Sequence, residues 1–196
     1  MSLGLFVEGQ SDKDTIPILI RKLGYASGIR TRVVPQGLML KSDRMKPYIR
    51  ALLAQDRSMD LVVICIDAEE AEPEHLLKQT REPRKSLGRD FAVPIRYAIV
   101  DHALEGWLAC DTDAVRSVLG PRATVRIRGN PENHPRPADL LSRVFRDNGR
   151  RFVKTSHDRQ IAERVTPAAI AARSPTFVAF IDALGLSPEV GRSGSR

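Results

Sequence analysis

The sequence has few of the features that assign a chain to a common class of site. It contains two cysteines, Cys65 and Cys110, without a CxxC pair or a Cys/His cluster. This pattern argues against a disulfide framework and a structural zinc site, and Cys65 within LVVICI is expected to be a small core residue. The four histidines are scattered without metal-ligand spacing. One of them, His102, is expected to be a local hydrogen-bonding group.

Long apolar runs and glycine signatures are also missing. No run of about eighteen apolar residues is present, so no segment is expected to span a membrane. The N-terminus, MSLGLFVEG, lacks the basic region and cleavage site of a signal peptide, which makes the cytoplasm the expected location. There is no Walker A loop and no GxGxxG or GxSxG motif, which argues against phosphate-loop ATPases, dinucleotide enzymes and serine hydrolases of the α/β type.

The apolar pattern predicts an α/β fold. Short apolar segments at 3–7, 31–34, 60–66 and 94–100 have the composition of strands, and helical spacing separates them. This alternation predicts a TOPRIM-like parallel sheet flanked by helices on both faces, with a helical C-terminal extension. We expect an α/β core at 1–120, a basic, mainly helical extension at 121–186 that packs on the core, and a disordered tail at 187–196. The expected helices are one that Ser11 opens and Gly24 closes, and those near 43–56, 72–82, 101–109, 112–119, 137–148, 158–172 and 174–185.

Positive and negative charge gather in different segments. The net charge is +7, and residues 121–164 carry eleven lysines and arginines against five acids. Residues 67–74 carry five acids and no basic residue. This division predicts a cation site beside a surface that binds nucleic acid, although an arginine-rich surface that reflects only genome composition would give the same counts. The candidate nucleic-acid-binding residues are Arg126, Arg128, Arg136, Arg150, Arg151 and Lys154.

Three of the expected strands end in acidic residues, namely Glu8, Asp67 and Asp101. In a parallel α/β sheet the carboxyl ends of neighbouring strands meet at one edge, where binding sites lie. Glu8, Asp67 and the nearby Glu69 are therefore expected to converge, with Glu105 one turn after Asp101. Clustered carboxylates repel one another unless a cation neutralises them, and Mg²⁺ or Mn²⁺ suits such hard oxygen ligands. Each acid taken alone could instead cap a helix or face water.

The order of these motifs resembles the TOPRIM fold of topoisomerases, primases and OLD-type nucleases. The matching elements are VEGQSD, which contains Glu8, and the strand that ends in Asp67–Ala68–Glu69. HALEGWLACD (102–111) and SPTFVAFIDAL (174–184) resemble more narrowly a bacterial TOPRIM-like family of unknown function, whose members are found near phage-defence and mobile-element genes. The resemblance extends from residue 3 to about residue 185.

The resemblance implies a role for each acid. Glu8 matches a glutamate that acts as general acid/base or metal ligand in strand cleavage. Asp67 and Glu69 match the divalent-metal pair, and Glu105 matches a glutamate that is a further ligand or a partner of metal-bound water. Asp111 matches a family aspartate whose purpose the resemblance does not specify.

Two positions depart from the family pattern. The second acid of the metal pair is Glu69, whose longer side chain shifts the metal or makes it bind through water. The family tends to have a lysine after the proline-rich turn, where this chain has Arg136, which keeps the charge but cannot shuttle a proton. Lys154 is then the remaining candidate for a catalytic or phosphate-binding lysine. No tyrosine is placed as a nucleophile, which argues against topoisomerase chemistry.

These observations support three hypotheses. The first is a Mg²⁺- or Mn²⁺-dependent nuclease that cleaves phosphodiesters in DNA or RNA, in phage defence or mobile-element biology, with catalytic Glu8, Glu105 and Lys154. The second is a catalytically silent nucleic-acid or nucleotide-binding sensor module of a defence complex, with a partner protein encoded nearby; a homodimer is also open. The third, a small-molecule phosphotransferase or phosphatase, leaves the basic segment unexplained. The expected metal ligands are Glu8, Asp67, Glu69 and Glu105.

Overall fold

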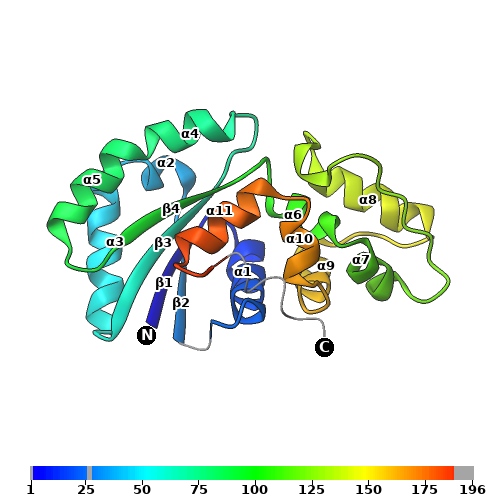
Figure 1. The fold of residues 1–196 in the computed structure, drawn as a ribbon, viewed down its shortest axis with the longest axis horizontal. Helices are drawn as coiled ribbons and strands as arrows, with labels where there is room; N and C mark the ends of the chain where they lie inside the picture. The colour runs from blue at the N-terminus through cyan, green and yellow to red at the C-terminus, as the bar shows by residue number, and fades with distance from the viewer. Residues whose placement is uncertain (1, 26–27, 188–196) are drawn as a thin grey trace.

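One parallel sheet lies at the centre of the fold (Figure 1). The computed structural model describes residues 2–25 and 28–187. Within these ranges the sheet has four strands in the order β2-β1-β3-β4, and all neighbouring strands run parallel. The strands are β1 (Ser2–Val7), β2 (Gly28–Val33), β3 (Met59–Asp67) and β4 (Ile95–Val100). The expected parallel sheet is therefore confirmed.

Helices cover both faces of this sheet, as the alternating pattern predicts. One face packs against α2 (Gln36–Met39), α3 (Ser42–Gln55), α4 (Pro73–Gln79) and α5 (Arg81–Asp90). The other face packs against a larger group of helices. These are α1 (Gln10–Lys22), α6 (Leu104–Cys110), α7 (Thr112–Leu119), α8 (Pro137–Asp147), α9 (Lys154–Ala162), α10 (Pro167–Ala171) and α11 (Pro175–Ala183), with a 3-10 turn, η1 (Pro131–Asn133), before α8.

Strand β3 supplies alternate side chains to two separate hydrophobic cores. Successive residues of a strand point to opposite faces, so a strand covered on both sides needs a continuous apolar run. Full burial of each such side chain contributes about 1.5–3 kcal/mol. The core beneath α1 contains Leu61, Val63 and Cys65. The core beneath α3 contains Val62, Ile64 and Ile66.

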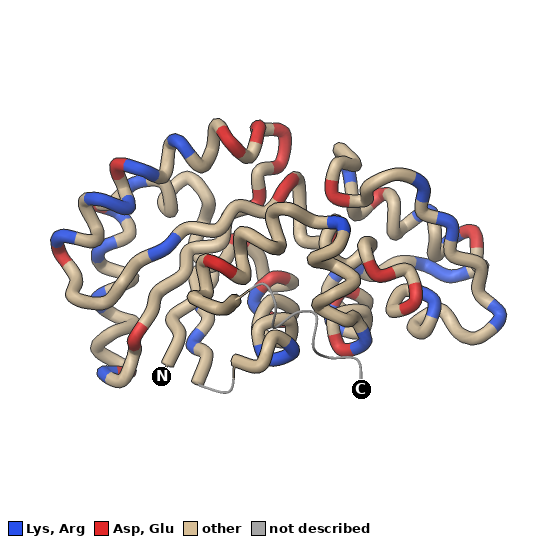
Figure 2. Tube along the Cα trace, viewed as in Figure 1, with Lys and Arg blue, Asp and Glu red and all other residues tan. Residues whose placement is uncertain are grey.

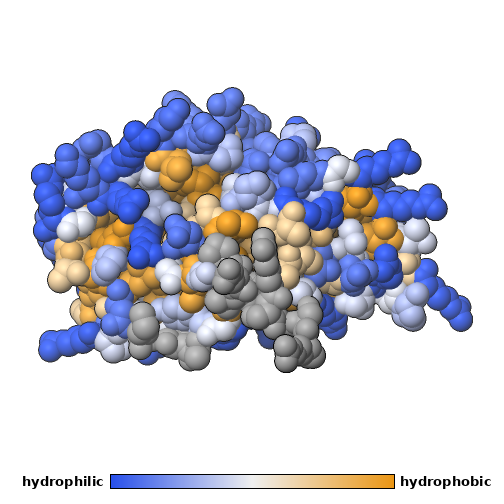
Figure 3. All heavy atoms as spheres, viewed as in Figure 1, coloured by the Kyte–Doolittle hydropathy of each residue, from blue (hydrophilic) through white to orange (hydrophobic). Residues whose placement is uncertain are grey.

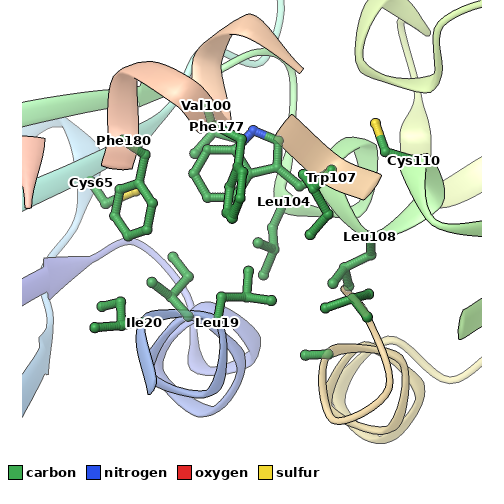
Figure 4. Packing of buried hydrophobic residues seen from close by; sticks show 14 of the residues in the cluster. Leu19, Ile20, Cys65, Val100, Leu104, Trp107, Leu108, Cys110, Phe177 and Phe180 are labelled. Atoms are coloured by element: carbon green, nitrogen blue, oxygen red, sulfur yellow. The ribbon is translucent and has the colours of Figure 1, made fainter. Parts of the chain in front are cut away.

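The C-terminal helix α11 completes the cover of the sheet through an aromatic cluster around Trp107 (Figure 4). The Trp107 ring centroid lies 5.1 Å from the Phe177 and Phe180 centroids. Its indole Nε1–H donates a hydrogen bond of 2.9 Å to Thr176 Oγ1, so the polar atom of this buried ring is satisfied. Leu19 of α1 belongs to the same core. Trp107 and α11 are therefore part of the hydrophobic core on this face of the sheet.

Several element boundaries differ from the prediction. Helix α1 begins at Gln10 with Gly9 as its N-cap, because Ser11 is buried and its hydroxyl binds elsewhere. The predicted helix at 72–82 is two helices that meet at Thr80. The predicted helix at 101–109 begins at Leu104, and α9 begins earlier than predicted, at Lys154.

The C-terminal helices and the sheet share one hydrophobic cluster. Helix α9 packs against α1, and α11 packs against β4. The predicted boundary at residue 120 stays a prediction. Of the predicted disordered tail, residues 188–196 lie outside the described residues. No helix in the described part of the chain is long and apolar enough to cross a membrane.

Candidate functional site

The site begins where β1 and β3 end side by side. Glu8 follows the last residue of β1, and Asp67 is the last residue of β3. The Asp67 backbone N–H donates a hydrogen bond of 2.8 Å to Glu8 Oε1. The Asp67 carbonyl accepts one of 2.7 Å from Gln36 Nε2. The structure therefore brings the first two predicted site residues together, through the backbone of one and the carboxylate of the other.

Both acids carry raised pKa values. Burial raises the pKa of Glu8 from 4.5 to about 7; Glu69 and Asp12 add to this, while the Asp67 N–H opposes it. Burial also raises the pKa of Asp67 well above its ordinary value, with further contributions from Asp12 and Glu8 against the opposing charge of Lys154. Groups that shift one another in this way lie in one electrostatic environment. Asp101, the third acid at a strand end, does not contribute to the pKa shifts of Glu8 or Asp67. Its carboxylate lies 3.7 Å from His102 Nε2.

Helices α6 and α9 add an ion pair to this edge. Glu105 is completely buried, and its Oε1 lies 2.9 Å from Lys154 Nζ. Burial alone would lower the pKa of Lys154, but Glu105, Asp12 and Asp158 together raise it above its ordinary value. Lys154 is therefore protonated at neutral pH and is a cation among the acids. The second oxygen of Glu105, Oε2, has no hydrogen-bond partner among the described residues.

Asp12 and Asp158 also belong to this group of buried acids, although neither is among the residues predicted from the sequence. Asp12 Oδ2 accepts a hydrogen bond of 2.9 Å from the Gly9 N–H, and Asp158 Oδ2 accepts one of 2.6 Å from Ser11 Oγ. The other oxygen of each carboxylate is buried without a hydrogen-bond partner in the described structure. Burial, with Glu105 next, raises the pKa of Asp158 to about 8, against Ser11 and Lys154, which lower it.

The sequence holds a different signal for each of these two acids. Asp12 is the N3 residue of α1, a position at which an acidic side chain reaches back to the N-cap N–H. Asp158 lies four positions after Lys154, so the two residues share one face of α9. Burial also raises the pKa of Asp12, against the opposing charge of Lys154 and the Gly9 N–H. Glu8, Asp12, Asp67, Glu105 and Asp158 thus form one group of interacting carboxylates, the acid cluster.

A cleft of about 500 Å³ opens beside the acid cluster. Glu69, His102, Glu105, Arg136 and Lys154 are among the residues that line it. The acidic connection between β3 and α4 lies close to this edge of the sheet (Figure 2). Four of the predicted site residues thus share one cleft. Glu8 and Asp67 are not among the lining residues. The charges of two residues that line the cleft contribute to their raised pKa values, Glu69 to that of Glu8 and Glu105 to that of Asp67.

Glu69 and His102 hold the two loops of the cleft together. Their φ angles are 50° and 53°, and no other non-glycine residue in the described ranges has a positive φ. The Glu69 N–H donates to the His102 carbonyl at 3.0 Å, and His102 Nδ1 lies 2.6 Å from the Glu69 carbonyl oxygen. Such left-handed conformations cost energy and are found where the surrounding structure imposes them, often at functional sites. His102 is thus a hydrogen-bonding group, as expected, with a place in the site.

Asp111 has a structural position. Its Oδ1 accepts hydrogen bonds from the Ala114 N–H at 2.9 Å and the Asp113 N–H at 3.2 Å, so it is the N-cap of α7. Its Oδ2 accepts the Thr166 N–H at 2.8 Å, at the start of α10. One carboxylate therefore fixes the beginnings of two helices.

Replacing Asp111 with alanine is expected to lower the free energy of unfolding by about 1–2 kcal/mol, the usual cost of losing an N-cap. Urea denaturation measures this. Asp113→Ala, at an exposed position of the same helix, is the matched control, with an expected change within about 0.5 kcal/mol. If Asp111→Ala left the stability unchanged and removed an activity, the capping role would be wrong.

The predicted nucleic-acid-binding residues occupy more than one place. Arg136 lies at the cleft with Lys154, whereas Arg150 and Arg151 line a separate hollow. Arg126 and Arg128 are exposed on the connection between α7 and η1. Figure 2 shows lysine and arginine positions along α8 and this connection. The predicted basic residues are therefore spread from the cleft to the end of the molecule that α7 and α8 form.

Comparison with known proteins gives one match. The model of DUF4276, a domain of unknown function, matches residues 7–185. The chain belongs to the DUF4276 family. No curated protein and no solved structure matches it. The expected membership of a family of unknown function is thus confirmed, and the matched part of this DUF4276 chain contains the whole acid cluster and Lys154.

The donor chemistry of this DUF4276 chain suits a hard divalent cation. Within residues 2–25 and 28–187, no three His, Cys, Asp or Glu side chains are arranged as a ready set of metal ligands. Mg²⁺, however, usually needs only one or two carboxylates and completes its shell with water and substrate phosphate. Asp12, Glu105 and Asp158 each present a buried carboxylate oxygen without a hydrogen-bond partner. The residues present therefore fit such an ion chemically.

Proposed function

We propose that this protein is a Mg²⁺- or Mn²⁺-dependent nuclease of TOPRIM type that cleaves phosphodiesters in nucleic acid. The observation that carries the proposal is the acid cluster. Five carboxylates share one edge of the sheet. The positive charge of Lys154 lowers the pKa values of three of them, Asp12, Asp67 and Asp158, against the effect of burial. The four-stranded parallel sheet is consistent with a TOPRIM-like fold, and the order of the motifs supports the assignment.

The burial of the acid cluster favours a bound cation. Ionised carboxylates taken out of water are costly unless they are paired, hydrogen-bonded or bound to a metal. In this cluster, burial raises pKa values to about 7 for Glu8 and about 8 for Asp158, so both acids become costly to ionise near neutral pH. A divalent cation would offset this cost.

Each group has a defined task in this proposal. One or two of the predicted carboxylates, Glu8, Asp67 and Glu69, with Glu105 close by, would hold a divalent cation whose shell water and phosphate complete. Such an ion would polarise the scissile phosphate and lower the pKa of an attacking water. Glu8, with a pKa of about 7, can accept or return a proton near neutral pH. Lys154 offers an ammonium group to a phosphate oxygen at the cleft. The surface arginines hold the nucleic-acid backbone without reading its sequence.

A catalytically silent nucleic-acid-binding module is the second candidate, and one observation favours it. The Lys154 ammonium already lies 2.9 Å from Glu105 Oε1 and compensates part of the negative charge. A cluster neutralised in this way has less need of a metal. Such a module would bind nucleic acid in a salt-sensitive way without turnover, as part of a defence complex.

Cleavage assays with Glu8→Gln test the nuclease assignment. Plasmid DNA, single-stranded DNA and RNA are incubated with Mg²⁺ or Mn²⁺, with EDTA as the metal-free arm. The Glu8→Gln variant is expected to lose about 10²–10⁴-fold in rate, the usual contribution of a general acid or base. The glutamine keeps the size of the side chain and can still accept the Asp67 N–H.

Glu82→Gln, at an exposed position of α5, is the matched control and should cleave like the wild type. Metal-dependent cleavage that persists unchanged in Glu8→Gln would overturn the assignment. Calorimetric titration with Mg²⁺, repeated with Asp67→Asn, separates the two candidates. Nucleic-acid binding without metal binding or turnover would favour the silent module.

A further inference from the structure

A second hollow, of about 570 Å³, lies beside the connection between α8 and α9. Arg146, Arg150, Arg151 and Phe152 line it, together with Ser142 and Gly149. Hydrophilic side chains project from the end of the molecule where α8 lies (Figure 3). Arginine in a hollow together with an aromatic ring is the combination that binds single-stranded nucleic acid, through phosphates and stacked bases.

The Phe152 ring is held in place before any ligand binds. It stacks on His157 with 5.7 Å between centroids and 22° between planes, and meets the edge of Phe145 at 5.1 Å. His157 is itself fixed, because its Nδ1 accepts the Val153 N–H at 2.7 Å. Phe152 is half-buried and still lines the hollow. A flat aromatic surface with little freedom to lose on binding is therefore available.

The arginines of the hollow differ in their freedom. Arg150 donates to the Val118 carbonyl at 2.8 Å and points back to the end of α7. Arg146 and Arg151 are exposed, and no ion pair involves either of them in the described part of the chain. These two guanidinium groups are available to phosphate oxygens, to which arginine binds well.

A short extended segment of the chain connects the hollow to Lys154, which pairs with Glu105 of the acid cluster. Residues 151–153 are not helical, and Lys154 begins α9. Two residues of extended chain span at most about 7 Å, so Phe152 and Lys154 are close neighbours. A strand bound in the hollow can therefore continue to Lys154 and the cleft.

We propose that this hollow is a subsite for single-stranded nucleic acid, in which one base stacks on Phe152 and adjacent phosphates bind Arg146 and Arg151. In a duplex each base face is covered by its neighbours, so a base can use an aromatic platform only when it is unpaired. The delivery of the strand to a cleavage site rests on the proposed function. The binding itself does not, and can be measured without turnover.

Fluorescence anisotropy with labelled oligonucleotides tests the subsite. The full chain carrying Glu8→Gln is titrated in EDTA with a single strand and with a duplex of the same sequence. The single strand is expected to bind at least about tenfold more tightly. Phe152→Leu is expected to weaken single-strand binding about 5- to 100-fold, the usual effect of removing one stacking partner, and to leave duplex binding nearly unchanged.

The arginine variants give a second readout. Arg146→Gln with Arg151→Gln should weaken binding and reduce the slope of log K against log salt by about 1.4, since each phosphate contact on a single strand contributes about 0.7. Arg84→Gln with Arg89→Gln, at exposed positions of α5, is the matched control. Phe152→Tyr keeps a flat ring and should restore single-strand binding, which separates stacking from a loss of folding.

The outcomes for the subsite and for the nuclease are distinct. Equal affinity for both nucleic acids, or single-strand binding that Phe152→Leu leaves unchanged, would overturn the subsite even if the protein cleaves DNA. Binding that depends on Phe152 without cleavage of any substrate would sustain the subsite and remove the nuclease assignment. If Phe152→Tyr binds as poorly as Phe152→Leu, the stacking role is wrong.

Discussion

Replacing Glu8 with glutamine is expected to make the protein more stable at pH 8 in the absence of divalent cations, by about 1–2 kcal/mol once solvent screening of this partly exposed carboxylate is allowed for. Burial raises the pKa of Glu8 from 4.5 to about 7 in the folded protein, and each pKa unit is worth about 1.4 kcal/mol. The folded state therefore holds this proton more tightly than the unfolded state between these two pH values. The stability that this proton contributes is fully present below pH 4.5 and is lost as the pH rises through about 7. Glutamine removes the ionisation and with it this loss.

Urea denaturation of both proteins at pH 5, 6, 7 and 8 in EDTA measures the effect. The two should have similar stability at pH 5, and the difference should grow toward pH 8. Glu82→Gln, an exposed position on α5, should follow the wild type at each pH. If the difference in free energy of unfolding between the wild type and Glu8→Gln were the same at every pH, the raised pKa of Glu8 would be wrong.

Adding Mg²⁺ extends the same experiment. A ligand that binds the folded state alone stabilises it by mass action. Mg²⁺ is therefore expected to raise the melting temperature of the wild type at pH 8, where Glu8 is ionised, more than that of Glu8→Gln. An equal shift for both proteins would place the ion away from Glu8.

The sheet and its acidic edge were predictable because local patterns determine them. The continuous run LVVICI can be buried only as a strand covered on both sides, and β3 shows that alternation between two cores. Parallel strands bring their carboxyl ends to one edge, so Glu8 and Asp67 had to be neighbours once the strand order placed β1 beside β3. Glu8 and Asp67 follow from this topology, and Glu105 joins them from the first turn of α6.

The remaining members of the site depend on tertiary packing that no local pattern encodes. Ser11 and Asp158 are 147 positions apart, and they meet because α9 packs against α1. Serine is a common N-cap residue, so the prediction assigned that role to Ser11. In the structure the Ser11 hydroxyl donates to buried Asp158, and Gly9 is the N-cap of the helix. The left-handed conformations of Glu69 and His102 likewise arise from the contact of two loops.

Replacing Lys154 with methionine is expected to destabilise the protein at pH 8 by about 2–4 kcal/mol. Breaking a buried ion pair by removing one partner costs about 3–5 kcal/mol, and the exposed part of Lys154, 45% of its side chain, reduces that figure. Glu105 stays fully buried without its cation, and Asp12 and Asp158 lose the charge that opposes their raised pKa values. Urea denaturation measures the loss, which should shrink as the pH falls toward 5 and the acids take up protons.

The double variant Lys154→Met with Glu105→Gln separates the ion pair from simple packing. With both charges removed, the remaining methionine and glutamine carry no uncompensated charge, and most of the lost stability should return. Lys85→Met, at an exposed position of α5, should change the stability by less than about 0.5 kcal/mol. If Lys154→Met were as stable as the wild type at pH 8, the acids of the cluster would already be protonated or solvated there. The need for a cation, on which the nuclease proposal depends, would then disappear with them.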